Sequence, residues 1–340
     1  MKIIKKQKNN KIVIEILVVG TGNIAIRHIK NIQAIYSNTK IYVLKRSSTK
    51  IDKFFDGKNI NVIKTINNIM PYSKKSLAVI CSPASLHSDD IKRLASKGFN
   101  IFVEKPLMIK KNRVSSLLKY FLNSKLLTHV GYNMRFTDRL NYIKDQIDKG
   151  KIKNIQNVNI EVLTDFRKWR KNKKYQDTVS FNKSLGGGVI NELSHEVDYM
   201  IYLFGKPKRV LVYRVDSHNL ISDVELNIKA IFKYENNLNV KICANMVSNK
   251  NIRICKINTD DKEIVINHIS NKIDIIGSKS NIIRFRDSVN TSYLGELEYV
   301  FNCLEKNIKS MFSIKSLIPT QLTLNAMHSS LNQKKWIYLR

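Results

Sequence analysis

Short apolar runs alternate with segments of helical periodicity in the first part of the chain. The apolar runs lie at residues 12–19, 40–44, 77–81, 100–103 and 127–131. Helical patterns lie between most of them, the first marked by Ile24, His28, Ile29, Ile32 and Ile35. Short apolar strands separated by helices are typical of a parallel sheet covered on both faces. The pattern predicts an α/β domain of the doubly wound type.

The order of predicted elements changes after about residue 136, where strand-like runs begin to follow one another directly. A helix at 138–149 and a strand near 155–163 come first, and a turn at 186–188 opens a helix to about 204. Further strands are expected at 209–215, 225–234, 238–246, 251–257, 263–267 and 272–276, and helices near 294–307 and 320–331. Successive strands with short turns favour an antiparallel sheet with one open face.

The length of the chain also indicates two domains, because 340 residues exceed the size at which single cores stop growing. We expect one domain over residues 1–134 and a second, α/β domain with a large, open, mainly antiparallel sheet over residues 135–340. The sequence shows no repeat and no low-complexity linker between them. A tight junction is therefore expected, with the ligand pocket between the two domains.

The formal charge of +32 does not by itself indicate a nucleic-acid-binding protein. Lysine is spread along the whole chain, whereas a nucleic-acid site concentrates basic residues on one face or stripe. We expect non-specific attraction to polyanions and no specific nucleic-acid partner. Anionic substrates, such as nucleotide-linked sugars, would also benefit from this field.

Cysteine usage and hydropathy point to the cytoplasm and to no membrane insertion. The four cysteines form no C-x-x-C pair, so neither a metal site nor a disulfide framework is expected. No run of 18 apolar residues occurs. The basic residues 1–11 precede an apolar run, as in a signal peptide, but Glu15 interrupts that run and no usual small-residue cleavage site follows. A first strand explains the run better.

A glycine-rich turn joins the first strand to the first helix. It reads Gly20-Thr21-Gly22-Asn23-Ile24-Ala25. Gly20 allows a tight turn, Gly22 lets a pyrophosphate approach the backbone, and the small Ala25 lets the helix pack on the strand. The N–H groups at the helix start would face the phosphates. The turn predicts a dinucleotide site; an ordinary strand–helix turn is the alternative.

The second strand indicates which dinucleotide is bound. An acid roughly 20 residues past the glycine turn would bind the ribose 2′-hydroxyl of NAD. The strand end here has no acid, and Arg46 and Ser47 suit a 2′-phosphate. NADP is therefore favoured and NAD is possible, since Arg46 could instead stack on adenine with either cofactor.

Two segments carry the candidate catalytic groups. Lys105 follows a strand within Glu104-Lys105-Pro106, where ligands of an open α/β sheet bind, and Pro106 restricts its backbone to an extended form. A lysine there can polarise a substrate oxygen. On the second segment, Glu192 and His195 are three residues apart, so on a helix they share a face. His195 is a natural general base, Glu192 can orient it or hold a hydroxyl, and Asp198 could anchor the helix.

These segments, taken together, resemble the Gfo/Idh/MocA family, the glucose–fructose oxidoreductase and inositol dehydrogenase group. The matching pieces are the glycine turn, Cys81-Ser82-Pro83 with His87, Glu104-Lys105-Pro106, residues 131–136 and residues 186–195. Their order and spacing fit nearly the whole chain. The resemblance implies an N-terminal Rossmann domain, a C-terminal α/β domain and, as in many relatives, a dimer or tetramer formed through the open sheet.

The resemblance also implies site residues that the local patterns do not. Ser82, Pro83, His87 and Glu104 join the cofactor-binding set, and Asn133 joins the substrate-binding set. The segment 165–170 is similar to that of members encoded among surface-polysaccharide and nucleotide-sugar genes. In those members Trp169 and Arg170 would lie near the nicotinamide and the substrate.

Anionic substrate groups would be bound by arginine. The candidates are Arg135, Arg167 and Arg170. One departure from the family is that many members carry Asp four residues before the active-site histidine. Here that position is Asn191, and the carboxylate is Glu192.

The sequence therefore predicts an NAD(P)-dependent dehydrogenase or reductase acting on CH–OH groups of a sugar or sugar nucleotide. His195 takes the hydroxyl proton while Lys105 polarises the oxygen. Two alternatives are a glycosidase that uses tightly bound NAD for transient oxidation and a non-catalytic dinucleotide-binding protein.

Overall fold

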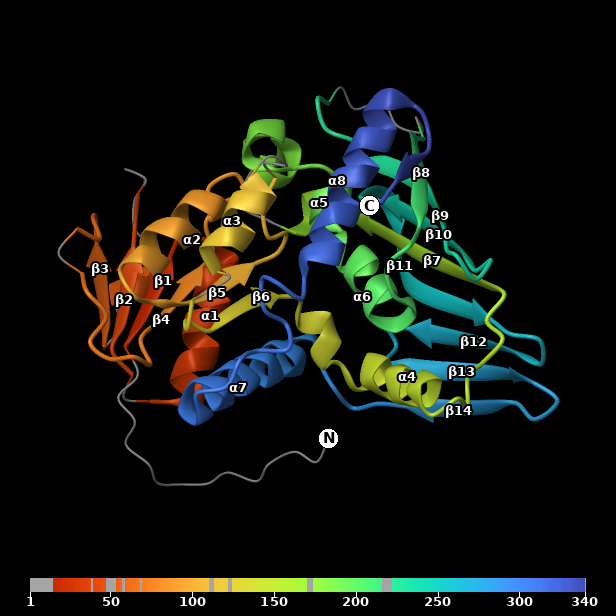
Figure 1. Cartoon of the computed structure of the whole chain (residues 1–340), viewed down its shortest axis with the longest axis horizontal. Coiled ribbons are helices and arrows are strands. Elements are labelled where there is room, and N and C mark those ends of the chain that lie inside the picture. The colour runs from red at the N-terminus through yellow and green to blue at the C-terminus, as the bar shows by residue number, and fades with distance from the viewer. Residues whose placement is uncertain are drawn as a thin grey trace.

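The computed structural model describes residues 15–37, 39–46, 53–56, 59–67, 69–109, 113–121, 124–169, 174–215 and 222–339. Within them the chain forms two sheets that lie side by side, with helices packed around the first and between the two (Figure 1).

The first sheet has six parallel strands in the order β3-β2-β1-β4-β5-β6. Their bounds are β1 Ile16–Val19, β2 Ile41–Leu44, β3 Ile60–Ile63, β4 Leu77–Ile80, β5 Asn100–Glu104 and β6 Thr128–Gly131. The predicted strands are confirmed, except that residues 12–14 lie outside the described part of the chain. β3 was not expected, because an edge strand is only half-buried and its apolar pattern is weak. The strand order reverses between β1 and β4, where this class of sheet binds ligands.

Helices cover both faces of this sheet. α1 (Asn23–Ile35) lies on one face, and α2 (His87–Ser96) and α3 (Val114–Phe121) lie on the other. α7 (Val289–Lys306), from the far end of the chain, packs beside α1 and contributes Leu297, Val300 and Phe301 to the core of the first sheet (Figure 1). The C-terminal part of the chain therefore helps to build the first domain. The boundary at residues 134 and 135 stays a prediction.

The second sheet has nine strands in the order β14-β13-β12-β11-β7-β10-β9-β8-β15. Their bounds are β7 Asn157–Asp165, β8 Arg209–Arg214, β9 Asn227–Lys233, β10 Asn239–Asn245, β11 Val247–Asn258, β12 Lys262–Asn267, β13 Lys272–Gly277, β14 Asn281–Arg284 and β15 Ile337–Tyr338. All neighbours are antiparallel except β7 and β10. Buried and more exposed residues alternate along β9 and β10, as expected for a sheet with one packed face.

The packed face of this sheet is covered by α4 (Asp138–Asp148), α6 (Ser194–Phe204) and α8 (Ile318–Gln333). The helix predicted after the triple glycine is in fact two helices. α5 (Val189–Glu192) ends at Leu193, whose backbone (φ −101°, ψ 31°) leaves the helical range before α6 begins. This break changes how Glu192 is placed relative to His195.

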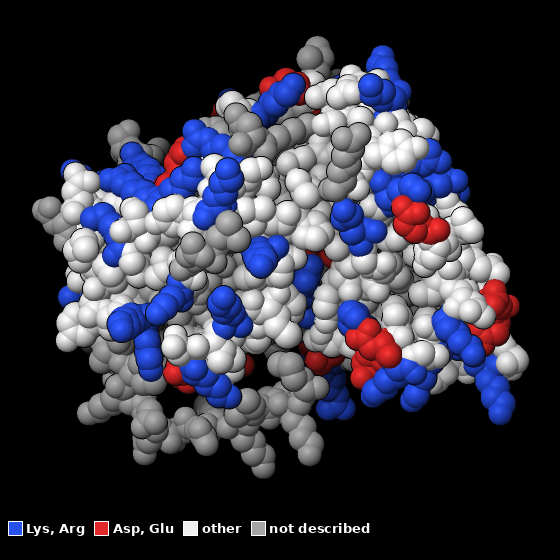
Figure 2. All heavy atoms as spheres, in the orientation of Figure 1, with Lys and Arg blue, Asp and Glu red and all other residues white. Residues whose placement is uncertain are grey.

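Basic side chains are scattered over the face seen in Figure 2, across both domains and without a continuous stripe. Among the described residues, no helix is both long and apolar enough to cross a membrane. In the same residues, no three His, Cys, Asp or Glu side chains gather as a metal site would require.

Candidate functional site

The turn after β1 is shaped to receive an anionic group. Gly20 has φ +112°, and a Cβ there would lie 2.9 Å from the carbonyl oxygen of Cys81, so only glycine fits. A Cβ at Gly22 would meet nothing within 4 Å, which means that the backbone faces open space. Gly22 caps α1 without a side-chain hydrogen bond, and Ala25 is fully buried against the sheet. The free N–H groups of the helix start can therefore bind a pyrophosphate.

The neighbouring loop after β4 is held in place by His87. This imidazole is buried, and its two ring nitrogens lie 2.8 Å from the Ser82 carbonyl oxygen and 2.9 Å from the Pro106 carbonyl oxygen. His87 thus links the loop of Ser82 and Pro83 to the loop of Lys105. Burial lowers its pKa. His87 therefore positions the backbone of these two loops, and its role in binding a cofactor stays a prediction.

Arg46, at the end of β2, is engaged by an acid from α2. Its guanidinium donates two hydrogen bonds to the carboxylate of Asp90, one of them 2.9 Å long, and the Ser82 hydroxyl donates a third at 2.7 Å. This hydrogen bonding raises the pKa of Arg46. Ser47, predicted beside it, lies outside the described residues. The group expected to bind a 2′-phosphate therefore already has an anionic partner.

Lys105 lies where β5 ends and reaches across to α5. Its Nζ donates a hydrogen bond of 2.8 Å to the backbone carbonyl of Glu192 and lies 3.8 Å from the Glu192 carboxylate. Both side chains are 18% exposed, so this pair remains partly open to solvent. The structure thus brings together two of the three residues predicted to be catalytic, 87 positions apart.

His195, the third, lies at the start of α6 with its ring edge-on to Tyr132, 5.6 Å between centroids. Burial lowers the pKa of His195 well below its usual value, and the positive charges of Lys105 and Arg253 lower it further. Its Nδ1 is buried and has no hydrogen-bond partner among the described residues. The imidazole is therefore neutral near pH 7 and can accept a proton, as a general base must.

Glu104 is the last residue of β5, directly before Lys105, and its side chain points toward α1. Its carboxylate is 2.6 Å from His28 Nε2 on α1, and both side chains are buried. The Lys105 backbone N–H also points to this carboxylate at 3.3 Å. Glu104 therefore fixes the backbone that carries Lys105, although the resemblance placed it among the cofactor-binding residues.

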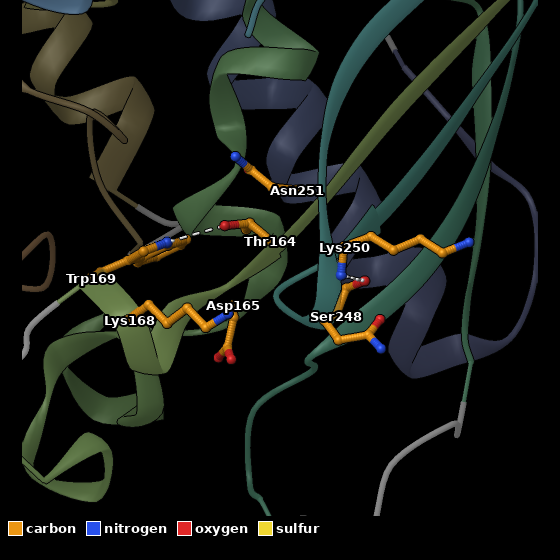
Figure 3. Close-up of a pocket in the computed structure, with 8 residues that line it drawn as sticks. Thr164, Asp165, Lys168, Trp169, Ser248, Lys250 and Asn251 are labelled. Atoms are coloured by element: carbon orange, nitrogen blue, oxygen red, sulfur yellow. Dashed lines mark hydrogen bonds between the residues drawn. The ribbon is translucent and has the colours of Figure 1, made fainter.

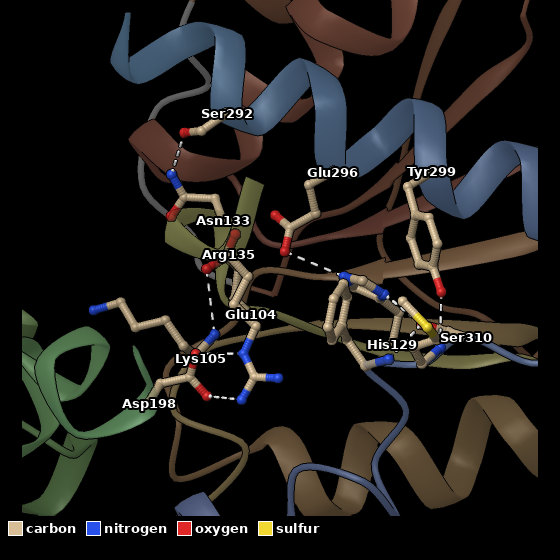
Figure 4. Close-up of polar contacts among 12 residues, drawn as sticks. Glu104, Lys105, His129, Asn133, Arg135, Asp198, Ser292, Glu296, Tyr299 and Ser310 are labelled. Atoms are coloured by element: carbon tan, nitrogen blue, oxygen red, sulfur yellow. Dashed lines mark hydrogen bonds and ion pairs between the residues drawn. The ribbon is translucent and has the colours of Figure 1, made fainter. Parts of the chain in front are cut away.

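Asn133 and Arg135 have partners of their own (Figure 4). Asn133 donates to the Ser292 hydroxyl at 2.7 Å, and Arg135 donates to both carboxylate oxygens of Asp198 at 2.7 and 2.8 Å. Thr320 also donates to Asp198. Burial raises the pKa of Asp198, while Arg135 opposes that rise. All of these groups are buried, and their contacts join residues 133–136 to α6 and α7; a substrate-binding role of Asn133 and Arg135 stays a prediction.

In this chain the acid before His195 is at position 192 rather than at position 191, and the contacts of the short helix α5 account for this change. The Asn191 side-chain oxygen lies 3.0 Å from His328 Nε2 on α8, so this side chain is engaged by the second domain. Glu192, one residue later, turns toward Lys105. The carboxylate beside the lysine is therefore provided by Glu192 in this chain.

A cavity of about 420 Å³ opens between the end of β7 and the start of β11 (Figure 3). The 3₁₀ turn η4 (Phe166–Trp169) provides Trp169, whose Nε1 donates to Thr164 at 3.2 Å and whose side chain is 37% exposed. Lys168 lines the same cavity. Arg167 is paired with Asp165 at 2.7 Å, and Arg170 lies outside the described residues.

Three residues near the site, Asp90, Glu196 and Arg253, were not singled out from the sequence. Asp90 binds Arg46, and Arg253 on β11 binds the carboxylate of Glu196, the residue after His195, at 2.7 Å. A signal for Arg253 existed: it alternates with Cys255 and Ile257, so it faces the helices rather than solvent. No local pattern could reveal the Asp90 contact, because it joins residues 44 positions apart.

The site and the two sheets define a dinucleotide-binding oxidoreductase. The chain belongs to the Gfo/Idh/MocA oxidoreductase family: its NAD-binding Rossmann fold matches residues 14–132, and its C-terminal alpha/beta domain matches residues 144–339. The resemblance and the fold class predicted from the sequence are confirmed.

Two curated relatives illustrate the family. Inositol 2-dehydrogenase from Rhizobium meliloti (strain 1021) is 35% identical over 98 residues, 29% of this chain and 30% of that enzyme. Glucose-6-phosphate 3-dehydrogenase from Bacillus subtilis (strain 168) is 21% identical over 191 residues, 55% of this chain and 53% of that enzyme. The match thus spans less than a third of the first enzyme and about half of the second.

Solved structures match over much more of the chain. Levoglucosan dehydrogenase in complex with NADH has a TM-score of 0.84 at 15% identity, covering 96% of this chain and 99% of that one. UDP-N-acetylglucosamine 3-dehydrogenase from Acidithiobacillus ferrooxidans has a TM-score of 0.78 at 14% identity, covering 95% and 99%. These likenesses establish the shared fold.

Proposed function

We propose that this protein transfers a hydride between a nicotinamide dinucleotide and a hydroxyl or keto carbon of a sugar or sugar nucleotide. The observation that carries this proposal is the contact of Lys105 with Glu192, together with the electrostatic effect of Lys105 on the buried imidazole of His195. Lys105 lies at the carboxyl end of β5, in a sheet whose first turn is shaped for a pyrophosphate. The NADH complex of levoglucosan dehydrogenase, which shares the fold, supports the cofactor class.

The turn from Gly20 to Ala25 fits the dinucleotide, since Gly22 leaves open space before a helix start with free N–H groups. Asn23 and Ile24 supply two of these backbone groups. The bound dinucleotide supplies the hydride acceptor or donor. The chain's own residues must then handle the proton and the charge on the substrate oxygen.

In the oxidation direction, His195 accepts the proton of the substrate hydroxyl. Lys105 donates a hydrogen bond to the same oxygen and stabilises the negative charge that develops there. Glu192 holds the Lys105 ammonium through its backbone carbonyl and balances the charge with its carboxylate. In reduction His195 returns the proton to the oxygen, and Lys105 polarises the carbonyl.

The cavity beside Trp169 is the proposed place for the part of the substrate remote from the reacting carbon. Its polar side chains could hold the hydroxyl groups of a sugar, and the partly exposed Trp169 ring offers an apolar surface beside them. The pocket and Arg253, whose charge acts on His195, both involve β11: Asn251 in the pocket wall lies two residues before Arg253. Lys168 and Lys250 line the pocket together with Asp165, and this excess of positive charge favours an anionic substrate, such as a nucleotide-linked sugar.

We also propose that the protein acts in the cytoplasm as a homo-oligomer. Among the described residues, no helix covers one face of the second sheet (Figure 1), and Glu161, Lys241 and Lys256 lie around a hollow of about 310 Å³ on this sheet. Complementary charges on a self-facing surface suit a twofold interface. Light scattering of the purified protein tests this, and a monomer at micromolar concentration would contradict it.

The first experiment is to release and identify any nucleotide on denaturation, then to titrate the protein with NADH and NADPH. Sugars and nucleotide sugars are next screened by nicotinamide absorbance. Exchangeable cofactor and net turnover support the proposal. Stoichiometric, non-exchanging NAD with no net absorbance change would support the glycosidase alternative instead. Cofactor binding without turnover, unaffected by loss of Lys105 and His195, would indicate the non-catalytic protein.

A further inference from the structure

We infer that Asp90 selects the cofactor of this protein and makes it bind NAD(H) more tightly than NADP(H). The inference rests on the proposed function, since it concerns the dinucleotide that the first domain binds. It reverses the preference for NADP that Arg46 alone suggested. The reason is that the sequence shows Arg46 without showing its partner.

The geometry places Asp90 at the centre of a closed cluster. Arg46 reaches it from the end of β2, and Ser82 reaches it from the loop after β4. The Asp90 side chain is 4% exposed, whereas that of Arg46 is 36% exposed. The buried partner therefore fixes the exposed one, and the guanidinium is held in a bidentate pair.

This cluster lies where the two dinucleotides differ. In open α/β sheets of this class, the ribose next to adenine is recognised beyond the end of the second strand. NAD carries a neutral 2′-hydroxyl there, and NADP carries a phosphate. Arg46 is the second residue after β2, so it stands at this position.

The charge balance of the cluster works against a phosphate. The Asp90 carboxylate neutralises Arg46 and takes up two of its N–H donors, and it also occupies the hydroxyl of Ser82. A 2′-phosphate would meet a neutral pair and, behind it, a buried carboxylate that repels it. A 2′-hydroxyl carries no charge and meets no such repulsion.

The test compares Kd values for NADH and NADPH, measured by nicotinamide fluorescence at about 0.15 M salt, where long-range attraction to a basic chain is screened. We expect the native protein to bind NADH at least about fivefold more tightly. Asp90→Asn keeps the shape but removes the charge, and should tighten NADPH binding by about tenfold while changing NADH by less than about threefold.

A matched control is Asp89→Asn, which removes the same charge one residue away on α2, where Asp89 pairs with Arg113. It should leave the NADH to NADPH ratio unchanged. The double variant Asp90→Asn with Arg46→Ala should lose the tighter NADPH binding of Asp90→Asn, because that increase in affinity comes from the Arg46 guanidinium released from Asp90. If Asp90→Asn does not fold, Asp90→Ser provides the same comparison with a hydroxyl partner for Arg46.

Tighter binding of NADPH by the native protein would overturn the inference. So would an Asp90→Asn variant that shifts both affinities equally or shifts neither. Failure of both nucleotides to bind would instead overturn the proposed function, so the two failures are distinguishable.

Discussion

Two pairs of oppositely charged residues, Lys105–Glu192 and Arg135–Asp198, differ in how deeply they are buried and how closely their charged atoms approach. In the first, Lys105 and Glu192 are each 18% exposed, and their charged atoms are 3.8 Å apart. In the second, Arg135 and Asp198 are buried, make two hydrogen bonds below 2.9 Å and receive a third from Thr320. In Figure 4, Lys105 extends away from the Arg135–Asp198 pair.

This difference distinguishes a charged pair that can take part in a reaction from one that only stabilises the fold. A charge that is partly exposed and loosely paired can act on a ligand. A buried charge in a close bidentate pair can be recruited only by breaking that pair, and breaking it is costly. Sequence reasoning placed Lys105 and Arg135 together in the substrate-binding set because residue type does not show how a side chain is paired.

Lys105→Met should give the largest effect. It keeps the length of the side chain and removes the charge that stabilises the substrate oxygen, so kcat should fall by about 10²–10⁴. The NADH Kd should change by less than about twofold, because Lys105 acts on the substrate. Steady-state kinetics and fluorescence titration measure the two effects. Lys92→Met, which removes a surface lysine on α2 that binds Ser116, is the control. Normal turnover in Lys105→Met would end the proposed mechanism.

Arg135→Met should act on stability instead. It leaves Asp198 buried without its cation, and the free energy of unfolding should fall by about 3–5 kcal/mol. Denaturant unfolding measures this loss. The double variant Arg135→Met with Asp198→Leu should recover at least half of it, because an apolar pair leaves no buried charge. A raised substrate KM at unchanged stability would show that Arg135 binds substrate after all.

Glu192→Gln should have an intermediate effect. It removes the carboxylate 3.8 Å from Lys105 but keeps the backbone carbonyl that the lysine binds. We expect kcat to fall by about tenfold, the effect of one partly screened charge. Asn191→Asp, which restores an acid four residues before His195, is the comparison and should change kcat by less than about twofold. The opposite ranking would place the functional acid at position 191.

His268→Phe should give the smallest effect, visible only as a pH dependence. Burial lowers the pKa of His268 well below its usual value, with Arg253 and Arg139 contributing. The unfolded chain therefore binds a proton below about pH 6.5 that the folded chain does not, so stability falls as pH falls through that value. Phenylalanine, packing on Tyr199, should reduce this loss by about 1 kcal/mol per pH unit below 6.5. Identical pH slopes of unfolding for the two proteins would contradict this.

Much of the fold was predictable because its signals are local. The strands of the first sheet are buried apolar runs, and Gly20 is required by a positive φ and a backbone contact. The three unpredicted strands β3, β14 and β15 lie at sheet edges, where none of their residues is fully buried and the apolar pattern fades. The helix break at Leu193 was also missed, since no glycine or proline marks it.

The sequence by itself determined the class of the protein, because periodicity and the glycine turn depend on residues close together in the chain. It also placed Lys105, Glu192 and His195 in the candidate site. Only the tertiary structure decided which charges are free to act. The pairs Arg46–Asp90, Arg135–Asp198 and Lys105–Glu192 join residues 44, 63 and 87 positions apart. An ion pair forms where folding brings two segments within a few ångströms, and neither segment alone carries that information.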